Sequence, residues 1–159
     1  MPVLALPLAA VKGSFLAGMR AQCADEGTPA EWLDEATRDF EAFVAARVAA
    51  RLMWDVPVTE LWYIDGERYI GTVMIRHELT PELRREGGHI GYHVVPGERR
   101  RGHATAMLAA AYDWCRGLGL TKVLVTCSAD NFGSRRVIEA NGGVLESETY
   151  DVLRYWISL

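Results

Sequence analysis

Residues 89–141 decide the fold of this chain, and they read HIGYHVVPGERRRGHATAMLAAAYDWCRGLGLTKVLVTCSADNFGSRRVIEAN. The stretch opens with an apolar and aromatic run, His89–Val95, that a proline-glycine pair ends, which predicts a strand followed by a turn. Past Gly102 the apolar residues recur at helical spacing, so we expect a helix to begin at this glycine. The near-continuous apolar run Thr121–Cys127 then predicts a buried strand, and Asp130–Ala140 a second helix. The order is therefore strand, tight turn, helix, strand, helix.

The turn between the first strand and the first helix has the pattern R-x-x-G-x-A, carried by Arg99, Gly102 and Ala104. A helix N-terminus leaves backbone N–H groups unbonded, its dipole favours negative charge, and Arg99–Arg101 add cations, so the turn predicts an anion site. The alternative is a loop in which the glycine relieves strain and the arginines lie in water. The lysine and serine of a Walker A motif and a G-x-G-x-x-G motif are absent, which favours a pyrophosphate held by backbone amides.

Several pieces of this half of the chain match a known family in the same order. They are the strand HIGYHVV, the turn Arg99–Ala104, Asn131 with Ser134 at the start of a helix that ends in Asn141-Gly142-Gly143, and the closing Arg154–Ile157. With these pieces the sequence resembles the GNAT superfamily of acetyl-CoA-dependent N-acetyltransferases, and most of all a bacterial subgroup of predicted acetyltransferases. The strong part of the resemblance covers about Gly88 to Leu159.

Upstream of this stretch the pattern predicts two helices and a hairpin. We expect the first helix at Ser14–Ala24, and a second that starts at a capping box, Thr28 to Glu31, and runs to about Arg51. The pair Asp65-Gly66 stands between two runs of alternating residues and is a strong signal for a β-hairpin. The polar face of the second helix is acidic, which fits a solvated surface or, alternatively, the steering of a cationic amine.

These elements indicate an α/β fold, and the resemblance implies its form. We expect a GNAT-like three-layer fold whose mixed central sheet has about seven strands, with four main helices, and which splays beside the strand His89–Val95. Thr121–Cys127 follows a helix, so it is expected to pair in parallel with that strand through a right-handed crossover. The length suits one domain, and residues 1–159 are interpreted as a single acyl-CoA N-acyltransferase domain.

The composition excludes several classes of function. A net charge of −4 argues against a general nucleic-acid binder, and no apolar run approaches the roughly 20 residues that cross a bilayer. The three cysteines, Cys23, Cys115 and Cys127, show no metal-ligand spacing and lie in apolar contexts, so we expect buried thiols and no metal. The expected location is cytoplasmic.

The resemblance implies a set of residues that hold acetyl-CoA. The pantetheine arm is expected to pair with the backbone of the strand as an added strand would, the pyrophosphate to lie on the amides of the turn, and an asparagine to bond the pantetheine amide. These residues are Tyr92, His93, Val94 and Val95 for the arm, Arg100, Arg101, Gly102, His103, Ala104 and Thr105 for the pyrophosphate, and Asn131 with Ser134 in the same groove. Helix capping is the alternative role of Asn131.

Acetyl transfer to an amine needs a base, because an alkylamine with a pKa of about 10.4 is mostly protonated at neutral pH. Similar proteins often place a glutamate base at the start of the central strand, where this chain has His89, so His89 is the predicted catalytic residue; a bond to the neighbouring glycine loop is its alternative role. The family's usual tyrosine acid matches Ile138 here, which leaves Tyr150 and Tyr155 as candidates by residue type. Glu60 is the next candidate for the base.

The sequence thus predicts an acetyl-CoA-dependent N-acetyltransferase that moves an acetyl group to a primary amine by direct attack in a ternary complex. Acetyl-CoA is the expected co-substrate, an amine the expected acceptor, and a homodimer through the aromatic C-terminal strand is an open option. The alternatives are a non-catalytic acyl-CoA-binding or regulatory module and a structural protein whose turn binds nothing. The sequence does not identify the acceptor amine.

Overall fold

The computed structural model describes the whole chain, Met1–Leu159, and contains two antiparallel sheets. The first sheet has five strands in the order β1-β3-β4-β5, with β2 paired to β3. Their bounds are β1 Val3–Ala5, β2 Arg51–Met53, β3 Val56–Asp65, β4 Arg68–Arg76 and β5 Ile90–Val94. The Asp65-Gly66 hairpin is confirmed, because β3 and β4 pair along their length with Asp65 opposite Arg68.

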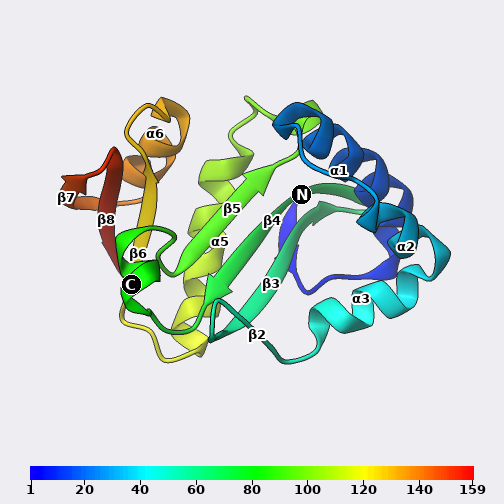
Figure 1. The fold of residues 1–159 in the computed structure, drawn as a ribbon, viewed down its shortest axis with the longest axis horizontal. Helices are drawn as coiled ribbons and strands as arrows, with labels where there is room; N and C mark the ends of the chain where they lie inside the picture. The colour runs from blue at the N-terminus through cyan, green and yellow to red at the C-terminus, as the bar shows by residue number, and fades with distance from the viewer.

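Three helices cover one face of this sheet (Figure 1): α1 Lys12–Glu26, α2 Trp32–Arg38 and α3 Phe40–Val48. The second predicted helix is thus two helices, since the backbone leaves the helical region at Asp39, whose side chain accepts the N–H of Ala42 and caps α3. The predicted capping box does not form, because α2 begins one residue after Glu31 without a side-chain cap. Phe15 stacks on Trp62 of β3 at 4.4 Å between ring centroids and anchors the helices to the sheet.

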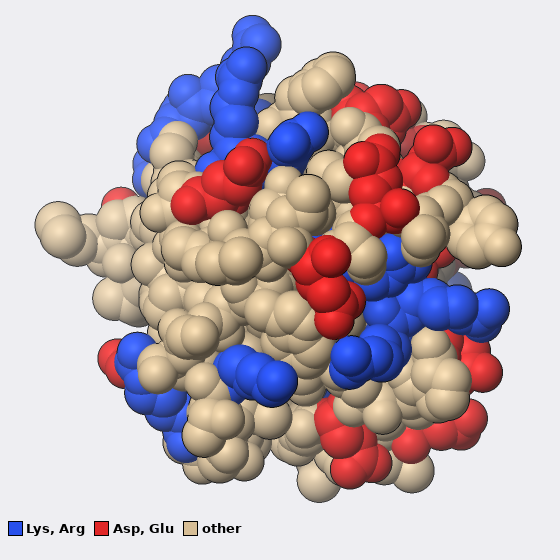
Figure 2. All heavy atoms as spheres, turned by 90° about the vertical axis from the view of Figure 1, so that its left-hand side faces the viewer, with Lys and Arg blue, Asp and Glu red and all other residues tan.

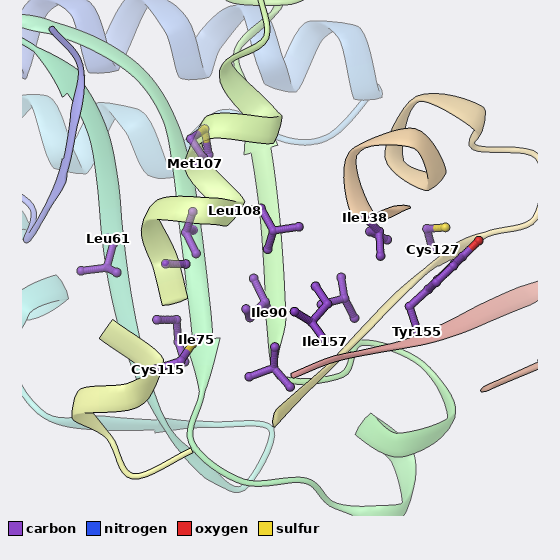
Figure 3. Packing of buried hydrophobic residues seen from close by; sticks show 14 of the residues in the cluster. Leu61, Ile75, Ile90, Met107, Leu108, Cys115, Cys127, Ile138, Tyr155 and Ile157 are labelled. Carbon is purple, nitrogen blue, oxygen red and sulfur yellow. The ribbon is translucent and has the colours of Figure 1, made fainter. Parts of the chain in front are cut away.

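Helix α5, His103–Gly117, packs on the opposite face and joins the first sheet to the second. The second sheet has the order β6-β8-β7, with bounds β6 Lys122–Ser128, β7 Val144–Thr149 and β8 Val152–Ser158. One hydrophobic core runs from Ile75 and Ile90 of the first sheet past Met107 and Leu108 of α5 (Figure 3). It continues to Ile138 in the last helix, α6, which spans Phe132–Ala140. Layers of helix, sheet and helix match the expected three-layer α/β fold.

The two sheets touch at the start of β5 and then separate (Figure 1). The N–H of His89 donates to the carbonyl of Leu124 at 2.8 Å, and the N–H of Leu124 donates back to Nδ1 of His89 at 2.9 Å. A Cβ at Gly88, where φ is +62°, would overlap the carbonyl oxygen of Leu124, so only glycine allows this approach. β5 and β6 were predicted to pair in parallel. In the structure their backbones are hydrogen-bonded only through His89 and Leu124, and the two strands diverge beyond this contact.

A short helix lies between β4 and β5 in the chain. Helix α4 spans Pro81–Arg85, and Thr80 caps it by accepting the N–H of Leu83. None of the helices combines the length and hydropathy that a bilayer-spanning segment needs. Figure 2 shows acidic and basic side chains interspersed over one face of the molecule, in keeping with a modest net charge.

Candidate active site

A groove opens where β5 leaves β6, and we call it the donor groove. It encloses about 290 Å³ and is lined by Arg76, Glu86, Gly87, Ile90, Gly91, Tyr92, Thr126, Cys127, Ser128, Asn131, Ser134 and Val152. Since β5 pairs only with β4, the backbone groups along its other edge have no strand partner. An unpaired edge of this kind accepts an extended chain that carries amide groups.

Three of the predicted cofactor residues meet in the donor groove. The hydroxyl of Tyr92 lies 2.7 Å from the hydroxyl of Ser134, so the pair bridges from β5 to α6. Asn131 caps α6 by accepting the N–H of Ser134 through Oδ1 at 3.1 Å. Its capping role is therefore present, and Asn131 lines the groove at the same time.

The N-terminus of α5 has the features of an anion site. Gly102 is its N-cap residue with φ +80°, no side chain caps the helix, and Arg100 before it also has positive φ. Ala106 is the first residue after Gly102 whose N–H bonds within the helix, to the carbonyl of Gly102. The amides of His103, Ala104 and Thr105 are thus the unbonded donors that a helix N-terminus offers to an anion.

The arginines of the turn differ in what they contact. Arg99 faces the protein: Nε donates to the carbonyl of Val94 at 3.1 Å, and the two Nη atoms donate to Gln22 and Asp25 of α1. Arg101 pairs with Glu98 at 3.3 Å. Arg100 takes part in no ion pair and is exposed, so it is the free cation of the turn.

A second cavity of about 270 Å³, which we call the acceptor cavity, lies on the face of the first sheet that α1–α3 cover. Its lining comprises Phe15, Met19, Trp32, Arg47, Glu60, Thr72, Met74, Arg76, Gly91, Tyr92 and His93. It shares Arg76, Gly91 and Tyr92 with the donor groove, so the two cavities adjoin at the open edge of β5. A donor in one and an acceptor in the other would meet at these three residues.

His93 lines the acceptor cavity, and side chains alternate along β5, so its ring lies on the opposite face from the side chain of Tyr92, whose hydroxyl bonds Ser134. Nε2 of His93 lies 3.2 Å from the hydroxyl of Tyr69, which also bonds the hydroxyl of Thr72. Burial lowers the pKa of His93, with smaller opposing contributions from Glu26 and Glu60. The ring is therefore neutral at neutral pH and can accept a proton. The backbone of Val95, by contrast, donates to Ile70 within the sheet and is not free.

His89, the predicted catalytic residue, lines neither cavity. Its Nδ1 is occupied by the N–H of Leu124, and the ring lies against Trp156, edge to face, at 6.3 Å between centroids. Burial, with help from the charge of Arg76, lowers the pKa of His89 to about 4. This geometry makes His89 the residue that holds the two sheets together at the splay, and its role as a base stays a prediction.

Glu60 and the candidate tyrosines are also placed by the structure. Glu60 is only 4% exposed, and its carboxylate accepts from Arg47, Arg51 and the indole of Trp62. Tyr150 is 95% exposed in the turn between β7 and β8, while the buried hydroxyl of Tyr155 has no hydrogen-bond partner.

Tyr92 is a residue that lines both cavities, and its hydroxyl lies in the donor groove beside Ser134, whereas sequence reasoning considered only its backbone. Ile138 is fully buried in the core. The sequence signal that could have singled out the Tyr92 side chain is its place next to Gly91 in the central strand.

Neither Cys115 nor Cys127 offers an activated thiol. All three cysteines are free and buried, as expected. Burial raises the pKa of Cys127, which lines the donor groove, and raises that of Cys115 to about 11. A thiol with a raised pKa is a poor nucleophile at neutral pH. No group of three or more His, Cys, Asp and Glu side chains is arranged to hold a metal ion.

Solved structures with the same fold include several acetyltransferases. RimJ of Mycobacterium smegmatis, in complex with CoA-disulfide, matches with a TM-score of 0.67 and 21% identity over 96% of this chain and 79% of that one. RimL, a ribosomal L7/L12 alpha-N-protein acetyltransferase in complex with coenzyme A, matches with a TM-score of 0.64 and 15% identity over 99% of this chain and 94% of that one. The microcin C7 self-immunity acetyltransferase MccE, in complex with acetyl-CoA and AMP, matches with a TM-score of 0.63 and 12% identity over 99% of this chain and 92% of that one.

Sequence comparison points the same way. No match was found among the curated proteins. The family model described as Acetyltransferase (GNAT) family matches residues 21–142, which include the central strand, the glycine turn, α5 and α6. The chain therefore belongs to the GNAT family of acetyltransferases.

Proposed function

We propose that this chain, acting as one domain, transfers the acetyl group of acetyl-CoA to a primary amine by direct attack in a ternary complex. The observation that carries the proposal is the meeting of two cavities at Arg76, Gly91 and Tyr92. The pantetheine arm would lie along the open edge of β5 in the donor groove, and the pyrophosphate on the amides that begin α5. The amine would enter from the acceptor cavity. Family membership and the acetyl-CoA and CoA complexes of RimJ, RimL and MccE support acetyl-CoA as the co-substrate.

The chemistry needs a group that takes the proton of the amine. His93 lines the acceptor cavity, is neutral at neutral pH and lies beside Tyr69. With the proton on Nε2 donated to the hydroxyl of Tyr69, the lone pair of Nδ1 is left to accept the proton of the amine. The geometry favours His93 over His89, whose Nδ1 already accepts from Leu124.

Bond formation and bond breaking then balance within the ternary complex. The nitrogen lone pair attacks the thioester carbonyl, the C–N bond forms, the C–S bond breaks, and the CoA thiolate leaves with the bonding pair. The hydroxyl of Tyr92, which lies beside Ser134 in the donor groove, is the candidate for returning a proton to that thiolate. Burial raises the pKa of Tyr92, so its hydroxyl holds its proton until the thiolate appears.

A screen of primary amines tests this function against the alternative of a non-catalytic acyl-CoA-binding module. Purified protein is mixed with acetyl-CoA and each amine, free CoA is measured with a thiol reagent, and the acetylated amine is identified by mass spectrometry. We expect CoA release in step with acetylamine for a subset of amines, well above hydrolysis without amine. Tight binding of acetyl-CoA with no acetylamine from any amine would favour the binding module instead.

A further inference from the structure

Arg76, the last residue of β4, is a buried cation without a counterion. It is 8% exposed and takes part in no ion pair. Its Nη1 donates to the carbonyls of Gly87 and Gly88 at 2.8 and 3.2 Å, Nε has no partner, and the guanidinium lies 4.2 Å from the ring centroid of Trp54. Buried charges are normally paired, because an isolated charge away from water is costly. Burial also lowers the pKa of Arg76.

The position of Arg76 in β4 places its side chain at the acceptor cavity. Side chains alternate along a strand, so Arg76 lies on the same face as Thr72 and Met74, the face covered by α1–α3. All three residues line the acceptor cavity, and Arg76 also reaches the donor groove. A Cβ at Gly91 would stand 3.3 Å from Nη2 of Arg76, so the absence of a side chain there leaves the guanidinium accessible at the junction.

The charges around the acceptor cavity leave a positive excess. Its only acid is Glu60, and that carboxylate is already bonded by Arg47 at 3.1 Å and Arg51 at 2.8 Å. Among the side chains that line the cavity, the cations Arg47 and Arg76 outnumber the anion Glu60 by one charge. An acceptor with several positive charges, such as a polyamine, would be repelled by this arrangement. An acceptor with a negative group would supply the missing counterion.

We propose that Arg76 binds a carboxylate of the acceptor, so that the substrates are small amines that also carry a carboxylate, such as amino acids. This inference rests on the proposed transfer to an amine and names the class of that amine. The carboxylate accepts a charge-assisted hydrogen bond from Nη2 of Arg76, which has no partner in the protein and lies beside Gly91. The same positive charge favours the neutral, nucleophilic form of the nearby amine. A cavity of about 270 Å³ has room for a molecule of this size.

Binding of matched acceptor pairs to the CoA-saturated protein tests the proposal without any need for turnover. The probes are the common α-amino acids, β-alanine and γ-aminobutyrate, each compared with its primary amide, which has nearly the same shape and no negative charge. Calorimetry should show that the acids which bind do so at least tenfold more tightly than their amides, a difference of about 1.4 kcal/mol. Arg76→Gln should remove this preference, and Arg76→Lys should keep part of it. Arg116→Gln, which changes an exposed arginine near the end of α5, should leave the preference unchanged.

Three results would overturn the proposal. One is equal binding of acids and amides by the parent protein, which is informative even if Arg76→Gln fails to fold. Another is a preference for acids that survives in a folded Arg76→Gln. The third is the absence of binding by every acid in the panel. Failure of the proposed function shows separately, as an absence of acetylated product when acetyl-CoA replaces CoA.

Discussion

Two histidines four residues apart in sequence have different surroundings. His89 is tied to the backbone of Leu124 and lines neither cavity, while His93 lines the acceptor cavity with Nδ1 free of protein partners. Burial lowers the pKa of both rings. At neutral pH each is therefore uncharged, and the proposed function assigns the role of base to His93, which lines the acceptor cavity.

Substitution separates the two histidines. His93→Gln should lower turnover at least tenfold, by the usual scale of general-base catalysis, with little change in acetyl-CoA affinity. His89→Asn should retain turnover, since Oδ1 of asparagine can replace Nδ1 as the acceptor from Leu124. Because the pKa of His93 is lowered, the rate should fall with acid through a midpoint below pH 6.5, and this fall should vanish in His93→Gln. The opposite result, loss of turnover in a folded His89→Asn and retention in His93→Gln, would return the role of base to His89.

Gly102 tests the anion site at the start of α5. Gly102→Asp places a negative charge where the pyrophosphate is expected, so acetyl-CoA binding should weaken tenfold or more. Gly119→Asp is the matched control, because Gly119 has φ +85° against +80° and neither glycine has an atom within 4 Å of an added Cβ. Calorimetric titration of both variants checks the expectation. Equal affinities in the two would mean that the pyrophosphate binds elsewhere.

At the scale of elements, the splay between β5 and β6 depends on one close approach of two backbones. Gly88 allows the carbonyl of Leu124 to come near enough for the paired bonds of His89, and the strands diverge directly afterwards. The two bonds fix the closed end of the donor groove. The stability of this junction thus determines whether the groove keeps its shape.

The cost of a side chain at Gly88 can be measured against a glycine with the same backbone angle. Gly66→Ala, at φ +61° in open space, should lower the free energy of unfolding by about 1 kcal/mol. Gly88→Ala, at φ +62° against the carbonyl of Leu124, should lower it by at least about 2 kcal/mol more, since the backbone must shift. Urea unfolding of both variants gives the difference. Equal losses would mean that the contact with Leu124 is not needed.

The elements that the sequence predicts well are those that local chemistry determines. Asp65-Gly66 forms a hairpin whatever surrounds it, and Gly102 begins α5 because the turn needs its positive φ. The break between α2 and α3 at Asp39 was missed, because a helical apolar pattern continues across it while the capping carboxylate ends it.

The candidate site was predicted in part, and what was missed depends on contacts between distant segments. The turn at α5 and the pair Asn131 and Ser134 follow from motifs. In the sequence Arg76 is one more arginine at the end of a strand. That it is buried without a counterion is seen only in the structure, where Gly87 and Trp54 surround it. The sequence also did not reveal the orientation of the His93 ring, because this depends on which face of the first sheet α1–α3 cover.

At the scale of the whole molecule, the two sheets and the three layers of the fold produce two cavities that open from different sides and adjoin at the edge of β5. This arrangement fits the proposed binding of donor and acceptor together, and burial raises the pKa of Cys127, the thiol that lines the donor groove. The architecture favours direct transfer over a covalent enzyme intermediate.

Initial rates of CoA release, measured while acetyl-CoA and an accepted amine are varied together, test this central claim most directly. Direct transfer in a ternary complex predicts reciprocal plots that intersect, with no acetylated protein found by mass spectrometry after incubation with acetyl-CoA alone. Parallel plots together with an acetyl group on Cys127 or another residue would contradict the account.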